Sequence, residues 1–243
     1  MTTDISFDLR DGLLQITLNR PQKANALTVE MMEALSTRLN AARQDDAVRG
    51  VLMTGAGERV FSGGVDVRAT STLPPEVFRQ QRSSTFFAVL LALVDFPKPV
   101  VAVVNGVASG GGMMIAALAD VIVASENASF ALPEIDLGSP PLAAFAVLTP
   151  AVGQSLAYDL VQTGRKLGVQ EAQQRGLVQS VVPQLQLLSE AEQRVRSWIS
   201  KNPRAIARSK AWVREPMRAE LEDRKSTRLN SSHVSESRMP SSA

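Results

Sequence analysis

Two glycine-rich turns carry the residue types that can act on a carbonyl compound. The first occupies residues 62–66 (Ser-Gly-Gly-Val-Asp), and the second occupies residues 109–112 (Ser-Gly-Gly-Gly) and runs into an apolar helical pattern. Glycines at such turns adopt unusual backbone dihedrals and let a ligand approach main-chain N–H groups closely. The first N–H groups of a helix also have no internal partner. Two such donors from separate loops can form an oxyanion hole, which stabilises negative charge developing on an oxygen.

Phosphate binding is the main alternative for turns of this composition. The first turn lacks the Gly-x-Gly-x-x-Gly pattern of dinucleotide-binding folds, and neither turn ends in the Gly-Lys-Ser/Thr of a P-loop. The sequence therefore disfavours nucleotide binding. Glycine turns after strands are also common, so each turn alone leaves a purely structural role open.

Strands and helices alternate around these turns. Period-two alternation predicts strands at residues 5–9 and 13–18, joined by a turn at 10–12. Thr28 opens a predicted helix, and Pro74-Pro75 begins a longer one. Strands early and helices late predict one α/β core with a helical C-terminal part. The other predicted elements are strands at 51–53, 100–104 and 121–123 and helices at 153–163, 169–175, 184–200 and 203–214.

Composition bounds the class of protein. The chain has 243 residues, 44% hydrophobic and 21% charged, which is typical of a soluble globular protein. No apolar run reaches the ~18–20 residues of a membrane span, and the N-terminus lacks the pattern of a signal peptide. The absence of cysteine excludes disulfides, thiolate nucleophiles and thiolate metal sites, and no other metal site is predicted. We expect a cytoplasmic enzyme that contacts no membrane.

The composition changes abruptly at Asp223. Residues 223–243 carry four Lys or Arg and two acidic side chains, so the rest of the chain has 22 of each sign and is formally neutral. The single histidine, His233, also lies in this segment. The net charge of +2 is thus local and does not indicate nucleic-acid binding. The segment resembles a translated sequencing adapter, and we expect the natural C-terminal sequence to differ from it.

Several short motifs in series resemble the enoyl-CoA hydratase/isomerase (crotonase-like) superfamily, over nearly all of residues 5–214. The resemblance implies a crotonase-like spiral of ββα units, with residues 1–200 as the α/β core and 201–222 as the start of the helical C-terminal region. Residues 223–243 are then a non-native tail. The motifs are residues 19–21 (Asn-Arg-Pro), 23–27 (Lys-Ala-Asn-Ala-Leu), 61–66, 98–100, 105–112, 130–138, 160–164 and 172–178.

The resemblance also implies a set of site residues. Matched position by position, the two main-chain donors that hold the thioester oxygen fall at Gly63 and Gly111, and one catalytic acid falls at Glu134. Relatives usually carry alanine where Gly63 stands. The substrate- and CoA-binding positions are Lys23, Ala26, Ser62, Gly64, Val65, Asp66, Arg68, Gly110, Met114, Pro133 and Leu142. Arg68 could meet a CoA phosphate, although a solvated side chain is an equal alternative.

The sequence departs from the hydratase pattern where a second glutamate is expected. Met114 stands there, and a methionine can neither hold nor deprotonate the water that hydration needs. A drier pocket is expected to raise the pKa of Glu134 by desolvation. Asp136 could share a face with Glu134 if the chain is extended there, but a solvated loop position is the stronger expectation. Prolines in residues 139–144 (Ser-Pro-Pro-Leu-Ala-Ala) predict a stiffer, altered acyl pocket.

One carboxylate beside an oxyanion hole is sufficient for a 1,3-proton shift. We therefore expect an isomerase, or another enolate-forming CoA enzyme, ahead of a conventional enoyl-CoA hydratase. A catalytically weak acyl-CoA-binding subunit is a further alternative. No cofactor is expected beyond the coenzyme A of the substrate. The family commonly forms trimers and hexamers, and we expect the altered C-terminus to impair that assembly here.

Overall fold

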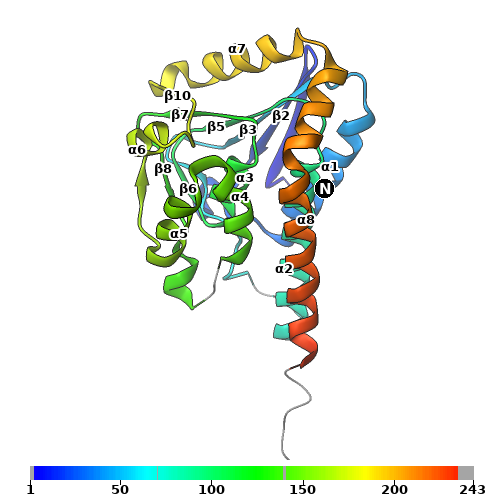
Figure 1. Ribbon diagram of the computed structural model, residues 1–243, viewed down its shortest axis with the longest axis vertical. Coiled ribbons are helices and arrows are strands. Elements are labelled where there is room, and N and C mark those ends of the chain that lie inside the picture. Colours follow the sequence, from blue (N-terminus) through cyan, green and yellow to red (C-terminus); the bar gives the residue numbers. More distant parts are fainter. Residues whose placement is uncertain (1–2, 70, 139–140, 235–243) are drawn as a thin grey trace, which may run out of the picture.

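The structure is a computed structural model that describes residues 3–69, 71–138 and 141–234 (Figure 1). It is a mixed α/β fold, as predicted. The strands are β1 (Ile5–Arg10), β2 (Leu13–Leu18), β3 (Gly50–Gly55), β4 (Val60–Ser62), β5 (Val100–Val104), β6 (Val107–Ser109), β7 (Val121–Ser125), β8 (Ser129–Ala131), β9 (Leu167–Gly168) and β10 (Ser180–Val182). The α-helices are α1 (Val29–Gln44), α2 (Pro75–Val94), α3 (Gly111–Ala117), α4 (Leu142–Val152), α5 (Gln154–Thr163), α6 (Val169–Gln174), α7 (Leu187–Ile199) and α8 (Pro203–Val234). Three 3₁₀ turns are η1 (Pro21–Lys23), η2 (Pro133–Leu137) and η3 (Gln184–Gln186).

The strands form two sheets, between which the chain alternates. The larger sheet has the order β1-β2-β3-β5-β7-β10 and the smaller one the order β4-β6-β8-β9. β3, β5 and β7 lie in the larger sheet, and the strand that follows each of them lies in the smaller one. A helix then follows each pair, α2, α3 or α4. This path confirms the predicted spiral of ββα units.

Local sequence signals set several of these elements. β1 and β2 form the predicted antiparallel hairpin, and Asp11 and Gly12 between them both have positive φ, as tight hairpin turns require. Thr28 caps α1 as predicted, because its side-chain oxygen accepts the Met31 N–H at 3.2 Å. α2 begins at Pro75, where a fixed φ and a missing N–H are tolerated.

The larger sheet is covered on both faces. Its inner face packs in the main core with α1, α2 and α3, and its outer face packs against α7, which lies across the sheet in Figure 1. Every residue of β5 is buried, which explains its unbroken apolar run (Val-Val-Ala-Val-Val). The smaller sheet consists of strands of two or three residues, too short for an alternation pattern. The sequence therefore did not predict β6, β8 or β9, nor the equally short β10 at the edge of the larger sheet.

α8 extends further than the predicted 203–214. It continues through residues 223–234, which the sequence assigned to a separate tail, and it projects beyond the body of the molecule past α2 (Figure 1). Leu221 is fully buried and Met217 packs against the main core, so tertiary contacts hold the helix as far as Leu221. Residues 235–243 lie outside the described part, and the adapter origin of the tail stays a prediction.

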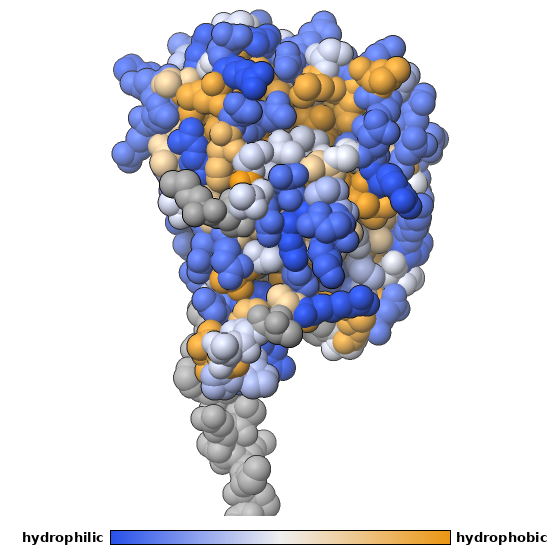
Figure 2. All heavy atoms as spheres, turned by 180° about the vertical axis from the view of Figure 1, so that it is seen from behind, coloured by the Kyte–Doolittle hydropathy of each residue, from blue (hydrophilic) through white to orange (hydrophobic). Residues whose placement is uncertain are grey.

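The surface is mostly hydrophilic on the reverse side of the molecule, with smaller apolar areas between the charged side chains (Figure 2). Among the described residues, no helix has both the length and the apolar character needed to cross a bilayer.

Candidate active site

The two glycine-rich turns meet because the strands before them are neighbours. β4 and β6 pair in parallel, which places the turns that follow at the same edge of the smaller sheet. A Cβ atom at Gly64 would lie 3.0 Å from the Gly111 nitrogen and 2.8 Å from the Ser109 carbonyl oxygen. Gly64 also has a φ of +93°, which side chains rarely tolerate. Glycine at this position therefore keeps the Gly111 nitrogen open.

The backbone N–H groups left free by the two turns are not the pair that was predicted. The Gly63 N–H donates to the Ala24 carbonyl oxygen at 2.8 Å, so it is not available to a ligand. The assignment of Gly63 as an oxyanion donor is therefore wrong. Within residues 3–69 and 71–138, neither the Val65 nor the Gly111 N–H donates to another group. Val65 Cγ2 lies only 3.1 Å from the Cβ position of Gly111, so these two donors belong to adjacent residues in space.

Glu134 lies over the second turn. It belongs to η2, and its Oε1 lies 2.7 Å from the position that a Cβ at Gly110 would take. Its Oε2 is buried and has no hydrogen-bond partner among the described residues. Burial raises the pKa of the Glu134 carboxyl above its usual range, and a backbone hydrogen bond opposes this rise in part. The site thus holds a desolvated carboxyl that binds its proton more tightly than an exposed glutamate does.

Apolar side chains lie beside Gly111. The Phe86 ring, from α2, comes within 2.9 Å of the Cβ position of Gly111, and Phe86 is itself buried. Met114 stands one turn further along α3 and is 5% exposed. The position where hydratases carry a second glutamate therefore holds a buried thioether.

Asp136 does not act as a substitute for that glutamate. The chain is a 3₁₀ turn here rather than extended, so residues two apart do not share a face. The Asp136 Oδ2 lies 3.1 Å from the Cβ position of Gly164, at the end of α5, whereas Glu134 lies against Gly110. The predicted solvated loop position is supported, since Asp136 is exposed.

The residues predicted to line the CoA groove fall into two groups. Lys23 and Arg68 are exposed, so both ammonium and guanidinium groups are accessible to phosphates. Ala26 and Asp66 are half-buried, and Arg20 bridges them. Arg20 Nη1 donates to the Ala26 carbonyl at 2.7 Å and to Asp66 Oδ2 at 3.1 Å. The Asp66 carboxylate is therefore engaged within the protein.

Of the remaining predicted residues, Ser62 and Pro133 shape the backbone of the site. Ser62 is fully buried and donates from Oγ to the Asn25 carbonyl at 2.9 Å, which ties the first turn to the preceding segment. Pro133 begins η2 and so sets the start of the turn that carries Glu134. Leu142 begins α4, but its side chain lies outside the described part of the structure, as do residues 139 and 140.

Sequence reasoning missed two polar residues that organise the first turn. Arg20 and Asn25 lie inside motifs of the family resemblance but received no role. Asn25 is fully buried, and its Nδ2 donates to the carbonyls of Ala56 and Val60 at 3.0 and 2.8 Å. A buried asparagine beside a glycine turn is a signal for such backbone satisfaction, but its partners are distant in sequence.

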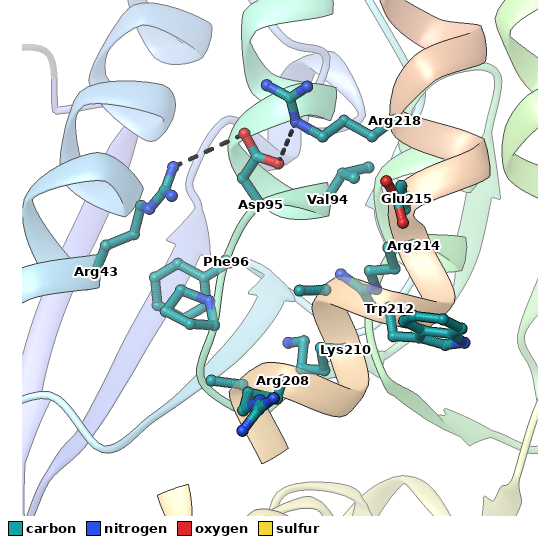
Figure 3. A pocket seen from close by; sticks show the side chains of 13 residues that line it. Arg43, Val94, Asp95, Phe96, Arg208, Lys210, Trp212, Arg214, Glu215 and Arg218 are labelled. Carbon is teal, nitrogen blue, oxygen red and sulfur yellow. Dashed lines mark hydrogen bonds and ion pairs between the residues drawn. The ribbon is translucent and has the colours of Figure 1, made fainter. Parts of the chain in front are cut away.

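A cavity of about 650 Å³ lies elsewhere, between α8 and the end of α2 (Figure 3). None of the predicted site residues lines it. Three of its basic side chains are paired with carboxylates: Asp120 accepts from Lys210 at 2.6 Å and from Arg214 at 2.7 Å, while Asp95 accepts from Arg218 at 2.8 Å. We therefore interpret this region as a structural interface, in which ion pairs hold α8 against the core.

Comparison with known proteins places the chain in a family. The sequence matches the model of the enoyl-CoA hydratase/isomerase family over residues 8–238. It is 37% identical over 216 residues to a carnitinyl-CoA dehydratase of Salmonella enteritidis, covering 88% of this chain and 82% of the relative. A carnitinyl-CoA dehydratase of Escherichia coli is 34% identical over 224 residues, with 92% and 85% covered.

Solved structures agree with the sequence matches. An enoyl-CoA hydratase from Mycobacterium avium subsp. paratuberculosis superposes with a TM-score of 0.84 at 29% identity, covering 96% of this chain and 90% of that one. An enoyl-CoA hydratase from Bacillus anthracis gives a TM-score of 0.81 at 30% identity, with 93% and 90% covered. The chain therefore belongs to the enoyl-CoA hydratase/isomerase family, whose members are enzymes that act on CoA thioesters.

Proposed function

We propose that this chain moves a double bond, or catalyses a related reaction through an enolate, on an acyl-CoA thioester. The observation that carries this proposal is the Glu134 carboxyl, buried with Oε2 unpartnered against the turn of Gly110 and Gly111. Burial raises the pKa of Glu134, which makes its carboxylate a stronger base than an exposed glutamate. Glu134 is then the sole acid and base of the reaction.

The thioester oxygen is held by the N–H groups of Val65 and Gly111. Both donors are unpartnered within the described residues, and they come from the two turns that meet at the sheet edge. Donors that are fixed before the reaction stabilise an enolate oxygen more than a neutral carbonyl, because the charge develops on that oxygen. Val65 takes the place that the sequence gave to Gly63.

The proton transfers follow from one base and one oxyanion hole. The Glu134 carboxylate removes a proton from Cα of a 3-enoyl thioester, and the electron pair of that bond moves onto the thioester oxygen. The protonated Glu134 then returns the proton at Cγ, and the double bond shifts from Cβ–Cγ to Cα–Cβ. No atom is gained or lost, so the reaction needs no second substrate.

Met114 disfavours the addition of water. Hydration needs one group to hold and deprotonate a water molecule and another to deliver a proton to carbon, and two carboxylates divide these tasks. The buried thioether of Met114 supplies neither. This difference is the reason to rank isomerisation above hydration.

Two assays test the proposal side by side. Hydration of crotonyl-CoA and isomerisation of a 3-enoyl-CoA are measured on the wild type and on Glu134→Gln. We expect isomerisation to exceed hydration in the wild type and to fall at least ~100-fold in Glu134→Gln, the lower end of a general acid–base contribution. Efficient hydration that survives the Glu134→Gln substitution would refute a one-base mechanism.

A conventional hydratase or dehydratase is the second candidate. It is favoured by the names of the relatives, which are carnitinyl-CoA dehydratases and enoyl-CoA hydratases. This candidate predicts rapid, reversible hydration by the wild type despite Met114. A binding subunit without catalysis is the third candidate, and it predicts tight binding of CoA thioesters with no turnover on any acyl chain.

Coenzyme A enters as part of the substrate, and we expect no separate cofactor. The exposed cations Lys23 and Arg68 flank the first turn and are suited to CoA phosphates. A homotrimeric or hexameric assembly and a cytoplasmic location are further expectations from the family. Light scattering coupled to size-exclusion chromatography measures the assembly, and a clean hexamer would contradict the expected impairment by the altered C-terminus.

A further inference from the structure

Two chain segments are joined by a dense set of hydrogen bonds around Val65. The Gly63 N–H donates to the Ala24 carbonyl at 2.8 Å, and the Leu27 N–H donates to the Gly64 carbonyl at 2.8 Å. The Asp66 N–H then donates back to the Leu27 carbonyl at 2.9 Å. These bonds fix the backbone on both sides of Val65, while its own N–H has no partner in the part of the chain that the structure describes. Residues 24–27 therefore act as a template for residues 63–66.

The template itself adopts an unfavourable backbone conformation. Ala24 and Asn25 have φ values of +52° and +50°, a region that costs non-glycine residues roughly 1–3 kcal/mol each. Arg20 holds this conformation, because its carbonyl accepts the Asn25 N–H and its own N–H donates to Asn25 Oδ1, both at 2.9 Å. Strain of this kind persists only where surrounding contacts over-determine it, and it concentrates at functional sites.

One side-chain pair links the template to the turn directly. Arg20 Nη1 donates to the Ala26 carbonyl at 2.7 Å and to Asp66 Oδ2 at 3.1 Å, and Arg20 Nε lies 3.3 Å from Asp4 Oδ2. The Arg20 and Asp66 side chains are 14% and 15% exposed, so solvent screens this pair less than a surface pair. Asp66 Oδ1 also accepts the Arg68 N–H at 3.1 Å. Asp66 directly follows Val65, so the pair acts on the residue next to the donor.

We infer that Arg20 is a positioning residue, which holds the Val65 N–H in place for the thioester oxygen by binding Asp66 and Ala26. This inference rests on the proposed function, since it assigns Val65 a role in that reaction. Arg20 itself does not touch the reacting atoms. A planar guanidinium suits the task because it donates in several fixed directions at once, which an ammonium does not.

The expected effect lies in the transition state rather than in substrate binding. Misplacing a catalytic group by about 1 Å can lower a rate by about 100-fold. Loosening the Val65 donor weakens the interaction with the enolate oxygen more than the interaction with the neutral thioester, because only the enolate carries a full charge. We therefore expect Arg20→Lys and Asp66→Asn to lower kcat about 10- to 100-fold and to change KM by less than about threefold.

The matched control is Arg165→Lys. Arg165 also joins two segments through carboxylates, at 2.6 Å from Asp159 and 2.8 Å from Glu171, but it links α5 to α6 and makes none of the contacts to residues 63–66. This control should lower the melting temperature without lowering kcat. It separates a general loss of an arginine–carboxylate pair from an effect on the turn.

A spectroscopic readout tests the role directly. The carbonyl stretching frequency of a bound, unreactive acyl-CoA, measured by isotope-edited infrared spectroscopy, reports how strongly the two N–H groups polarise the thioester. We expect Arg20→Lys to return this frequency toward its value in water, with Arg165→Lys unchanged from the wild type. Folded Arg20→Lys and Asp66→Asn proteins with wild-type kcat and wild-type carbonyl frequency would overturn the inference.

The failure of the proposed function gives a different pattern. If the wild type turns over no CoA thioester, or if Glu134→Gln retains full activity, the proposed reaction is wrong whatever Arg20 does. If the wild type is active and depends on Glu134 while Arg20→Lys changes only the melting temperature, only the positioning role is wrong.

Discussion

Alanine at Gly64 is expected to remove most of the activity while leaving the protein folded. Its Cβ would lie 2.8 Å from the Ser109 carbonyl oxygen and 3.0 Å from the Gly111 nitrogen. Both neighbours are backbone atoms, so the turns must separate by several tenths of an ångström. The new methyl group also stands beside the Gly111 N–H, where the thioester oxygen has to bind.

The structure allows the two costs to be separated. The φ of +93° at Gly64 costs an alanine about 1–2 kcal/mol of folding stability, whatever surrounds it. Blocking one oxyanion donor costs a further ~2.7–4 kcal/mol in the transition state, which is a factor of about 10² to 10³ in kcat. The second cost appears only in catalysis.

Gly153 provides the matched control. It has a φ of +80°, and a Cβ there would meet nothing within 4 Å. Gly153→Ala therefore carries a backbone cost of its own, at a φ and ψ of +80° and 158° that side chains rarely adopt, without touching the turns. The assay compares the free energy of unfolding and kcat/KM of the two variants on the best thioester substrate. Destabilisation of both variants with activity lost only in Gly64→Ala is expected, and a folded Gly64→Ala enzyme with wild-type kcat/KM would contradict a role of Gly64 in keeping the Gly111 N–H open.

Four further predictions follow from the surroundings of Glu134, Met114 and Asp120. Because the carboxylate is the active form and burial raises the pKa of Glu134, kcat/KM should rise with pH and level off above that raised pKa, and a limb at the ordinary value of 4.5 would contradict it. The folded protein keeps the Glu134 carboxyl protonated to a higher pH than the unfolded chain does, so the free energy of unfolding falls as pH rises from 4.5 through the raised pKa. Glu134→Gln should lose this dependence in denaturant titrations. Met114→Glu should increase hydration of crotonyl-CoA relative to isomerisation, measured in paired assays, because it supplies the second carboxylate. Asp120→Ala should destabilise the protein by about 3–5 kcal/mol in denaturant unfolding, since it leaves Lys210 and Arg214 buried without their shared partner.

Local signals predicted much of the fold. The β1–β2 hairpin, the Thr28 cap of α1 and the buried strand β5 each depend on neighbouring residues, and the structure confirms all three. The smaller sheet was missed in part because its strands have two or three residues and are stabilised by tertiary pairing. The end of α8 was missed because a polar, serine-rich sequence has weak helical preference by itself.

The site was predicted at the level of its turns and its carboxyl, but not at the level of its donors. Whether Gly63 or Val65 has a free N–H depends on the Ala24 carbonyl, which reaches the turn only because Ala24 and Asn25 adopt positive φ. No pattern in residues 62–66 carries that information. Likewise, Pro133 begins the 3₁₀ turn that separates Asp136 from Glu134, but a single proline does not distinguish such a turn from an extended segment.

The most direct test of a one-base enolate mechanism is proton exchange at Cα. Butyryl-CoA has no double bond to move or hydrate, so its exchange of α-protons with deuterium oxide, followed by NMR, reports enolate formation alone. A one-base enolate mechanism predicts enzyme-dependent exchange that falls at least ~100-fold in Glu134→Gln and in Gly64→Ala. Exchange at the wild-type rate in Glu134→Gln, or no exchange by a folded wild-type enzyme that binds butyryl-CoA, would contradict it.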